Sequence, residues 1–586
     1  MWYVVSIMIF NPKRDPKNGP RTYDLCIIGS GPAGLTIANE LKDAGITLCV
    51  LESGRHKKSS GADKLRRVVC TGVIVKEQSR ERIFGGASTV WSGLSSLLDT
   101  VDFEQRSFVK MPGWPISRAS LHEYYTRAAE QYGFPSPGQL DARYLAPLRV
   151  RSEWRPTWDS LDEKVFLASS PVKNFGTDLK KIFEKDDCDL FLDATVMKLE
   201  AAPGGSHAVS ALVRSSDGSR FRLEAKRFVA ATGGIENARL LLNSNDAHPS
   251  GLGNAHGQVG RYLMNHPKNY YGVIVLNKPV KELPYYFGHT KEGLAGYAGL
   301  RLKERAQKEK GLLNSYVRFE PLYPWSDSPG IEAFVTLVRG AKPLMNAWLK
   351  SKKASVVPLR DYSETGERSE TQHELTSLTD WLKLFGPVLF HIVPVCRYVW
   401  SRLIEKGAPP VTRIRLRNFM EMEPRAENRV TLSSTKDAYG EPLPHVHHEC
   451  SELDKRSLIE LHRVLGQEVA ALGFGRLESN LADEQRWPID HDASHHMGTT
   501  RMGSDPKSSV VDLNCKIHGV DNVYVAGASV FAMSGCANPT MTLVALAIRL
   551  ADHLKSVIVV QATIENIGDS PTDVPSAFDD EHTHAS

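Results

Sequence analysis

Two short apolar runs near the N-terminus, Leu25 to Ile28 and Thr47 to Leu51, give the chain its first clear pattern. Continuous runs of this length are typical of strands that are buried on both faces of a parallel sheet. The residues between them, from about Pro32 to Ala44, predict a helix. Because parallel neighbours need such a crossover, this stretch predicts a β-α-β unit.

The turn between the first predicted strand and the helix reads GSGPAG. Gly29 permits a tight turn, Gly31 lets the backbone approach a pyrophosphate, and Gly34 allows close packing of helix on strand. The N-terminal amides of the helix favour the negative diphosphate. Glu52 ends the second strand about 20 residues later, where a carboxylate binds ribose hydroxyls. The unit predicts a dinucleotide site for FAD or NAD, and the acid argues against a 2′-phosphate.

Two later stretches repeat the pattern of a buried strand followed by a helix. Residues 226–244 contain a strand, a glycine turn and a helix, and residues 522–554 contain a strand and a long helix. Asn538 suits the N-cap and Pro539 the first helical position, so the long helix should begin there with a positive N-terminus. Residues 85–89 add a run of small side chains whose backbone can lie flat against a planar ligand.

Two other segments admit more than one interpretation. In PHVHHEC, residues 444–450, histidines and a cysteine alternate, which would suit zinc. A turn-like stretch before it and a capping-box pattern at Ser451 and Asp454 after it favour a strand crossing the substrate-domain sheet. Residues 381–400 are strongly apolar, but two prolines, a lysine and an arginine argue against a membrane-spanning helix. We expect a buried helix pair first, a subunit contact second and a lid touching a membrane last.

Composition narrows the class of protein. The 586 residues are 41% apolar and 24% charged, as in globular proteins, and the length suggests about two to four domains. A net charge of +4 does not indicate a nucleic acid partner. Eight cysteines without CxxC spacing suit a reducing compartment. The apolar N-terminus lacks a basic region and a cleavage site, so we expect no secretory signal and a cytoplasmic protein.

The segment HHMGTTRMG, residues 495–503, places two histidines before a loop of small residues. Alone it admits a metal site, a structural pair or a catalytic base. His491 and Asp492 are the nearest further ligands, and their spacing matches no known metal site, so we expect no metal. Adjacent side chains on an extended segment point in opposite directions, so only one of the two histidines can face a given ligand.

These motifs together resemble the glucose–methanol–choline (GMC) oxidoreductases, which are FAD enzymes that oxidise alcohols. The resemblance extends from about Tyr23 to Leu554 and is weaker between about residues 285 and 410. Within the family, STVW and a histidine–asparagine pairing are most similar to the sugar-oxidising pyranose oxidase branch. The resemblance to the family as a whole rests on the motifs GSGPAG, GGASTVW, GWPISRASLHEYY, ATGGIENARLLL, GRYLMNHP, HHMGTTRMG and NPTMT.

The resemblance implies His495 as the catalytic base and Asn538 as its partner. A neutral imidazole suits removal of a hydroxyl proton while a hydride passes to flavin N5. The Asn538 amide would orient the substrate oxygen, and the helix that begins there would direct its positive end at flavin N1 and O2. His496 is then expected to be structural, and His266 to fix a loop near the cofactor.

FAD is expected to bind without a covalent bond, because Val90 stands where some relatives carry the histidine that attaches it. The resemblance and the glycine motif together predict cofactor contacts from Gly29, Gly31, Gly34, Glu52, Ser53, Gly85, Gly86, Ser88, Thr89, Trp91, Val196, Ala231, Gly527, Ala528, Asn538 and Thr540.

The predicted fold is α/β, a doubly wound Rossmann-type FAD-binding domain with an inserted α+β substrate domain. The FAD-binding domain is assigned to residues 20–100, 187–265 and 500–557, and the substrate domain to residues 101–186 and 266–499. Residues 1–19 and 563–586 are expected to be tails, the second of them polar and disordered.

The predicted function is FAD-dependent oxidation of a secondary alcohol on a sugar, glycoside or related polyol. The alternative is a non-redox lyase of the hydroxynitrile lyase kind, because both reactions begin with deprotonation of a hydroxyl. Oxygen, a quinone or a redox protein could each reoxidise the flavin. Besides the small-molecule substrate and this acceptor, we expect no nucleic acid partner and no membrane contact. A homo-oligomer is an open alternative to a monomer.

Overall fold

The computed structural model describes residues 22–72, 74–76, 79–140, 157–169, 171–280, 283–290, 292–323, 326, 328–348, 378–403, 410–484, 487–489 and 494–568. The predicted N-terminal tail, the candidate ligands His491 and Asp492, and residues 569–586 of the predicted C-terminal tail lie outside these ranges. Residues 563–568 belong to the last helix, α13 (Pro539–Gly568).

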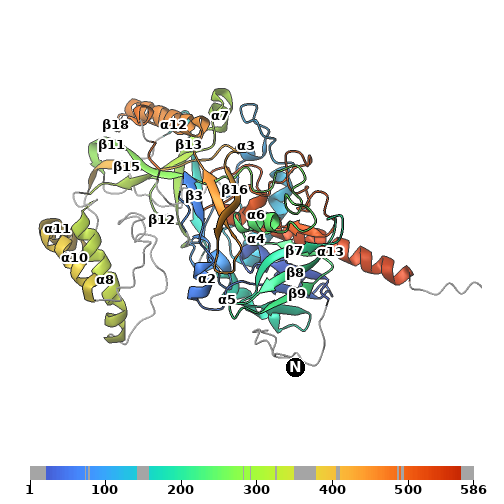
Figure 1. Cartoon of the computed structure of the whole chain (residues 1–586). Coiled ribbons are helices and arrows are strands. Elements are labelled where there is room, and N and C mark those ends of the chain that lie inside the picture. The colour runs from blue at the N-terminus through green and yellow to red at the C-terminus, as the bar shows by residue number, and fades with distance from the viewer. Residues whose placement is uncertain are drawn as a thin grey trace, which may run out of the picture.

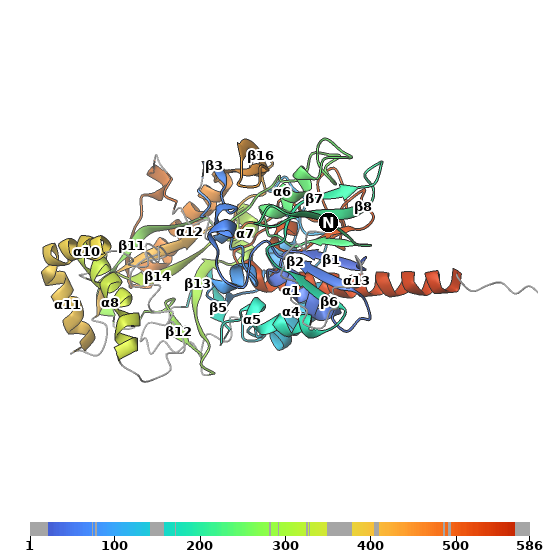
Figure 2. The same cartoon turned by 60° about the horizontal axis from the view of Figure 1, so that its bottom comes forward.

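One part of the molecule is built on a five-stranded parallel sheet (Figure 2). Its order is β19 (Val523–Val525), β10 (Phe228–Ala230), β1 (Leu25–Ile28), β2 (Leu48–Leu51) and β6 (Cys188–Phe191). Every residue of these strands is buried, including Asp189 in β6, and the other side chains are apolar or aromatic, as expected for a parallel sheet. The late return of the chain to this sheet is confirmed, because β19 pairs with β10 in parallel register.

Helices pack against this sheet. α1 (Pro32–Leu41) contacts α13, which also contacts α4 (His122–Tyr132), and all three contribute to one hydrophobic core with the sheet. α1 begins where predicted but ends three residues before the expected Ala44. α6 (Glu236–Asn243) follows β10. The shorter helices are α2 (Ser60–Lys64), α3 (Thr100–Phe103), α5 (Phe175–Leu179) and α7 (Glu304–Lys310).

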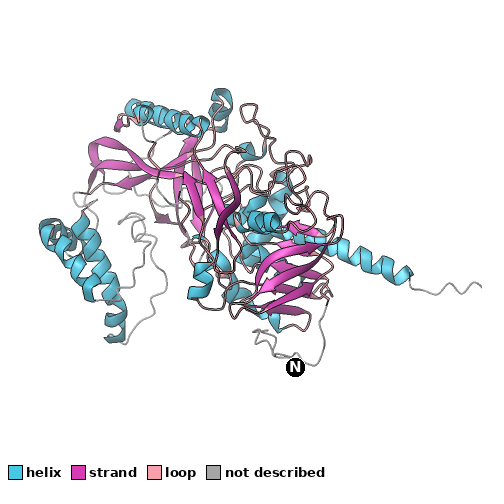
Figure 3. Ribbon diagram, viewed as in Figure 1, coloured by secondary structure: helices cyan, strands magenta, loops and turns pink. Residues whose placement is uncertain are grey.

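The other part of the molecule is built on an antiparallel sheet (Figure 3). Helix α12 (Glu452–Ala471) contacts its edge strand β18 and begins at the predicted Ser451–Asp454 capping box. Apolar side chains of the sheet and of α12 form a second core. The predicted α/β fold class is confirmed. The strand order is β18 (Gly475–Glu478), β11 (Lys268–Val280), β15 (Val411–Phe419), β14 (Tyr316–Pro321), β13 (Ala295–Leu302), β5 (Leu161–Ala168) and β4 (Leu94–Ser95), and β12 (Gly288–His289) pairs with β13.

Two three-stranded sheets complete the strands. One consists of β7 (Thr195–Ala201), β8 (Ala208–Arg214) and β9 (Arg220–Glu224). The other orders β16 (Arg429–Lys436), β17 (Pro442–His448) and β3 (Val69–Gly72). PHVHHEC does form a strand, but the prediction that it crosses the large substrate-domain sheet is wrong. The turn before it folds β17 back on β16, and the parallel strand β3 occupies its other edge.

The apolar stretch 381–400 forms a bent helix pair, α10 (Leu378–Phe390) and α11 (Ile392–Leu403). It packs against α8 (Pro329–Trp348), and these helices project from one end of the molecule (Figure 1). The prediction of a buried pair is wrong. Phe390 is 90% exposed and Leu389 is 68% exposed, because α8 covers only one side of the pair.

Candidate functional site

The glycine-rich turn after β1 brings strand and helix into direct contact. Gly29 has a φ of +106°, and a Cβ there would lie 2.6 Å from Ala231 O. A Cβ on Gly34 would overlap Gly29 O, so the helix can approach the strand only with glycine at this position. Gly31 is the N-cap of α1, and a Cβ there would meet no atom within 4 Å. The space in front of Gly31, at the positive end of α1, therefore fits a diphosphate.

Glu52 supports this turn from the end of β2. Its Oε2 accepts hydrogen bonds from Ser30 N at 3.0 Å and Ser30 Oγ at 2.6 Å, and its Oε1 accepts one from Gly54 N at 2.7 Å. Ser53 Oγ accepts a hydrogen bond from Arg82 at 3.1 Å. A carboxylate oxygen can accept more than one hydrogen bond, so Glu52 is compatible with binding ribose hydroxyls while it holds the turn.

The small-residue segment packs directly on the glycine-rich turn. A Cβ on Gly86 would lie 2.9 Å from Gly31 Cα, and Gly85 N donates to Ser30 Oγ at 3.2 Å. Both glycines have positive φ angles, +99° for Gly85 and +56° for Gly86. The structure therefore brings the two predicted glycine segments together at the N-terminus of α1.

The side chains that follow hold the shape of this segment. Ser88 Oγ donates to a backbone carbonyl at 2.6 Å, and Thr89 Oγ1 donates to another at 2.9 Å. Trp91 Nε1 donates to Lys173 O at 2.8 Å. Val90 is 46% exposed, so part of its side chain is open to solvent.

The residues that follow β10 and β19 contact β1 and α1 next to this turn. Ala231, after β10, donates its N–H to Ile28 O at 2.8 Å. Gly527, after β19, has a φ of +110°, and its Cβ position lies 4.0 Å from the side chain of Ala33 in α1. Ala528 follows it and is buried. The ends of three parallel strands thus surround the start of α1, where ligands bind in open α/β sheets.

Val196 is held by strand pairing and the start of α13 by a side-chain hydrogen bond, both outside the glycine-rich turn. Val196 lies in β7 and pairs with Val213, shortly after Ala194, whose N–H donates to Glu52 O at 2.9 Å. Asn538 precedes α13, which begins at Pro539 as predicted, and Thr540 lies in its first turn. Asn538 Nδ2 donates to the carbonyl of Leu94 in β4 at 2.9 Å. One N–H of this amide is therefore engaged, and its second N–H and its oxygen remain able to bind another group.

His495 faces His266 across a short antiparallel bridge. Met264 and Met497 exchange two backbone hydrogen bonds of 3.0 Å, so the residue two positions after Met264 lies opposite the residue two positions before Met497. Those residues are His266 and His495, whose Nδ1 atoms are 3.0 Å apart. Asn265 Oδ1 accepts the backbone N–H of His266 at 2.8 Å and that of His495 at 3.0 Å, which fixes both segments.

The hydrogen-bond partners of His266 determine its proton positions. His266 is buried, and this burial lowers its pKa to about 4, so the ring is neutral near pH 7. Its Nε2 lies 2.9 Å from Gly535 O, which can only accept, so His266 carries its proton on Nε2. His266 Nδ1 is then an acceptor, and His495 must donate from Nδ1. A neutral His495 therefore has its lone pair on Nε2, which is the state that a general base needs.

His496 points into a different environment. It is 9% exposed, and a Cβ on Gly234, in the turn after β10, would overlap the backbone of His496. The next residues run beside the segment that follows β19, because Gly498 N donates to Ala528 O at 3.2 Å and Thr500 N donates to Ser529 O at 2.9 Å. The HHMGTTRMG segment thus connects the His266 strand to the end of β19.

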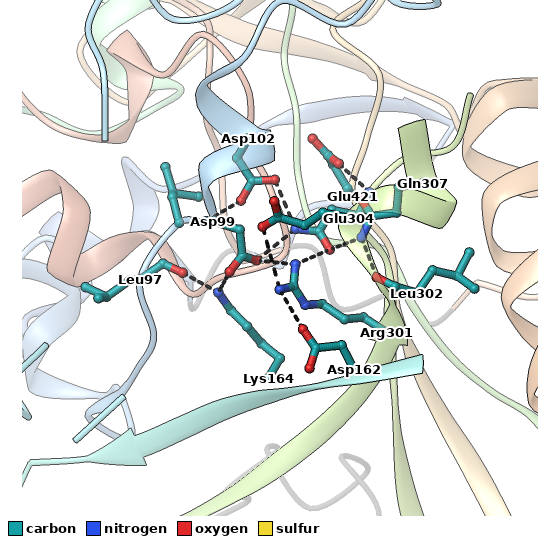
Figure 4. A network of polar contacts seen from close by, with 12 residues as sticks. Leu97, Asp99, Asp102, Asp162, Lys164, Arg301, Leu302, Glu304, Gln307 and Glu421 are labelled. Atoms are coloured by element: carbon teal, nitrogen blue, oxygen red, sulfur yellow. Dashed lines mark hydrogen bonds and ion pairs between the residues drawn. The ribbon is translucent and has the colours of Figure 1, made fainter. Parts of the chain in front are cut away.

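A buried network of charged side chains, shown in Figure 4, includes Asp102, which lies beside Gly535, the residue whose carbonyl oxygen is the partner of His266 Nε2. Asp99 makes ion pairs with Lys164 at 2.7 Å and with Arg301 at 2.9 Å. Burial raises the pKa of the neighbouring Asp102 to about 7, and the charge of Asp99 adds to this effect. A Cβ on Gly535 would overlap Asp102 Oδ2, so the Gly535 carbonyl can take this position only with glycine. Neither this network nor the role of His266 as the partner of His495 follows from the sequence motifs.

Comparisons with known proteins match two parts of the chain to families. Residues 22–64 match "FAD binding domain", and residues 424–547 match "GMC oxidoreductase". The first range contains the glycine-rich turn and Glu52, and the second contains His495 and Asn538.

Individual relatives are distant. The chain is 25% identical to fructose dehydrogenase large subunit of Gluconobacter japonicus over 58% of this chain and 48% of that protein. It is 23% identical to 2-methyl-1,2-propanediol dehydrogenase of Mycolicibacterium austroafricanum over 94% and 98% of the two chains. Pyranose 2-oxidase of Tricholoma matsutake is 30% identical over 28% of this chain and 30% of that protein. A solved structure, pyridoxine 4-oxidase from Mesorbium loti, gives a TM-score of 0.49 at 15% identity, covering 91% and 99% of the two chains.

The residues around the start of α1 fit FAD on structural grounds, because Gly31 leaves open space at a helix N-terminus and a buried carboxylate stands beside it. The region that matches an FAD-binding domain contains these same residues, and the region that matches GMC oxidoreductases contains His495, the candidate base. The two matches thus indicate an FAD-dependent oxidoreductase whose C-terminal part, residues 424–547, is similar to the GMC oxidoreductases.

Proposed function

We propose that this enzyme oxidises a secondary alcohol on a sugar, glycoside or related polyol, with His495 as the base. The observation that carries the proposal is the hydrogen bond between the Nδ1 atoms of His266 and His495, which leaves His495 Nε2 as an acceptor. Fructose dehydrogenase and pyranose 2-oxidase are named for sugars, which supports this substrate class.

In the proposed reaction, His495 Nε2 accepts the proton of the substrate hydroxyl. FAD, when bound, supplies the acceptor for the hydride that leaves the same carbon, so the alcohol becomes a carbonyl compound. The protonated His495 keeps its Nδ1–H bond to the neutral ring of His266, which stabilises the new positive charge without a competing proton. We assign the second N–H of Asn538 to the substrate oxygen.

Cofactor binding is assigned to the residues around the start of α1. The backbone at Gly31 and Gly86 would hold the diphosphate, and Glu52 would bind the ribose hydroxyls. We propose that FAD is held without a covalent bond, since Val90 carries no group that can attack the flavin.

The proposal is tested by mixing the flavin-loaded enzyme anaerobically with a panel of sugars, glycosides, polyols and simple alcohols. We expect loss of the flavin absorbance near 450 nm with at least one sugar or polyol, at a rate that exceeds those with simple alcohols. Loss with simple alcohols alone would contradict the sugar assignment. No loss with any alcohol would contradict oxidation.

The same experiment distinguishes oxidation from the lyase alternative. A lyase would consume its substrate while the flavin absorbance stays constant, so cyanohydrins belong in the panel with product analysis. Reoxidation with oxygen and with an artificial quinone, measured in parallel, would then identify the class of electron acceptor.

A further inference from the structure

The bend between α10 and α11 exposes a cluster of large apolar side chains. We call this cluster the apolar tip. The helices meet at 86°, and the bend is held by α8, because a Cβ on Gly330 would overlap His391 and Pro387 O lies 2.7 Å from that position. The apolar tip consists of Phe385 (49% exposed), Leu389 (68%), Phe390 (90%), Ile392 (47%) and Val393 (63%).

The apolar tip itself is uncharged, and basic residues lie on both sides of it. From Phe385 to Cys396 the sequence contains no charged residue, and the exposed cations Lys383 and Arg397 flank that stretch. The three helices α8, α10 and α11 together contain five basic and two acidic residues. Trp400 is 59% exposed one turn beyond Arg397. Exposed apolar and aromatic side chains next to cations match the surface of an anionic lipid membrane, where Lys and Arg reach the headgroups and Trp lies at the interface.

The geometry favours shallow insertion over crossing. Among the described helices, none is alone long and apolar enough to span a bilayer, and the pair that passes the test together is bent. Leu382–Phe390 would extend only about 13 Å as a helix, against roughly 30 Å for the hydrocarbon core. A bent pair of this length can place its apolar tip below the headgroups while both helices return to the same side.

A second copy of the chain fits the apolar tip less well. Interfaces between subunits bury broad, complementary patches, and their centres are depleted in charge. Here the most exposed residues, Leu389 and Phe390, lie at a convex bend, and cations flank them on both helices. Two such tips would bring like charges together around a small contact, which costs free energy.

We propose that the apolar tip inserts into the surface of an anionic membrane and holds the enzyme there. This departs from the expectation, drawn from the sequence, that the chain makes no membrane contact. If the enzyme is cytoplasmic, the surface concerned is the cytoplasmic leaflet, which carries negative charge.

The test is flotation of the FAD-loaded, full-length enzyme with vesicles of phosphatidylcholine, with and without 30% phosphatidylglycerol. We expect the enzyme to float with the anionic vesicles and to float less at high salt, because salt screens the cations. The double substitution Leu389→Glu/Phe390→Glu should lower the apparent partition coefficient more than about tenfold. The matched control Val209→Glu/Leu513→Glu also adds two carboxylates, at residues 43% and 37% exposed, and should float like the parent.

Three results would overturn the proposal. The parent enzyme could fail to float with either vesicle, or the double variant could float as the parent does. Light scattering could instead show a stable dimer in buffer that Leu389→Glu/Phe390→Glu dissociates, which would make the apolar tip a contact between copies. The flavin absorbance of each variant reports that it remains folded, so a failure to fold is not mistaken for a failure to bind.

Discussion

Met264 and Met497 determine which two histidines face each other. Their paired backbone hydrogen bonds set an antiparallel register in which MNH and HHM run past one another. In this register His495 meets His266, and His496 turns toward Gly234. A shift of one residue would exchange the two neighbours, because adjacent side chains on an extended strand point to opposite sides.

His495→Ala should therefore slow anaerobic reduction of the flavin by about 100- to 10,000-fold, the range that a general base contributes. FAD should stay bound, because the residues around α1 are untouched. The measurement is the rate of flavin bleaching after rapid mixing with the best substrate of the panel.

His496→Ala is the matched control, since it removes the same side chain one residue away. It should mainly lower thermal stability, because His496 is buried against the turn after β10. At the partner position, His266→Asn keeps an acceptor and a donor and should reduce flavin faster than His266→Leu. If His496→Ala abolished reduction and His495→Ala did not, the assignment of the base would be reversed, and parental rates in both would exclude a base from this segment.

At the same scale, the sequence predicts some site residues well and misses others. The spacing of Gly29, Gly31 and Gly34 is a local pattern whose geometry the backbone enforces, and the structure places them as that pattern requires. His266 is different, because its contact with His495 depends on two segments more than 200 residues apart. No local spacing carries that information, although the MNH and HHM sequences become complementary once the pairing is known.

At the scale of the element, the β1–α1 unit depends on glycines for two separable reasons. Gly34→Ala places a Cβ on the carbonyl of Gly29, so strand and helix must separate, and the variant should lose both stability and FAD. Gly31→Ala meets no protein atom within 4 Å, so it should fold normally but purify with less FAD. Thermal unfolding and the ratio of flavin to protein measure the two effects.

Gly61→Ala in α2 is the control for these substitutions. It also adds a methyl group that meets no atom within 4 Å, its φ is not positive, and none of the residues assigned to the cofactor lies in α2. It should change stability by no more than about 1 kcal/mol and leave the FAD content unchanged. A normal FAD content in Gly31→Ala would mean that the diphosphate does not approach this residue.

Elements with strong local signals are predicted closely, and their partners are not. The strands Leu25–Ile28 and Leu48–Leu51, the start of α13 at Pro539 and the capping box of α12 all follow from local sequence. The sequence does not predict the sheet to which β17 belongs, because strand pairing is decided by neighbours elsewhere in the chain. The exposure of the α10–α11 pair is not predicted either, because apolar composition alone does not distinguish a core helix from an exposed one.

At the scale of the whole molecule, the two sheets contribute to different parts of the site. The parallel sheet supplies the ends of β1, β10 and β19, and the antiparallel sheet supplies Lys164 and Arg301 to the buried network beneath Gly535. The general α/β architecture follows from the sequence, whereas the ion pairs of Asp99 with Lys164 and Arg301 require the folded arrangement. Removing one charge from this network would leave its partner buried, which is costly.

The attachment of FAD is a property of the whole fold and gives the last prediction. The residues assigned to the cofactor come from three distant stretches, which only the folded chain holds together. Val90 offers no nucleophile, so unfolding should separate these stretches and release the flavin. After acid or heat precipitation, the flavin absorbance should therefore be found in the supernatant, and the protein pellet should be colourless. Flavin that remains with the washed pellet would reveal a covalent bond to another residue, which peptide mapping would locate.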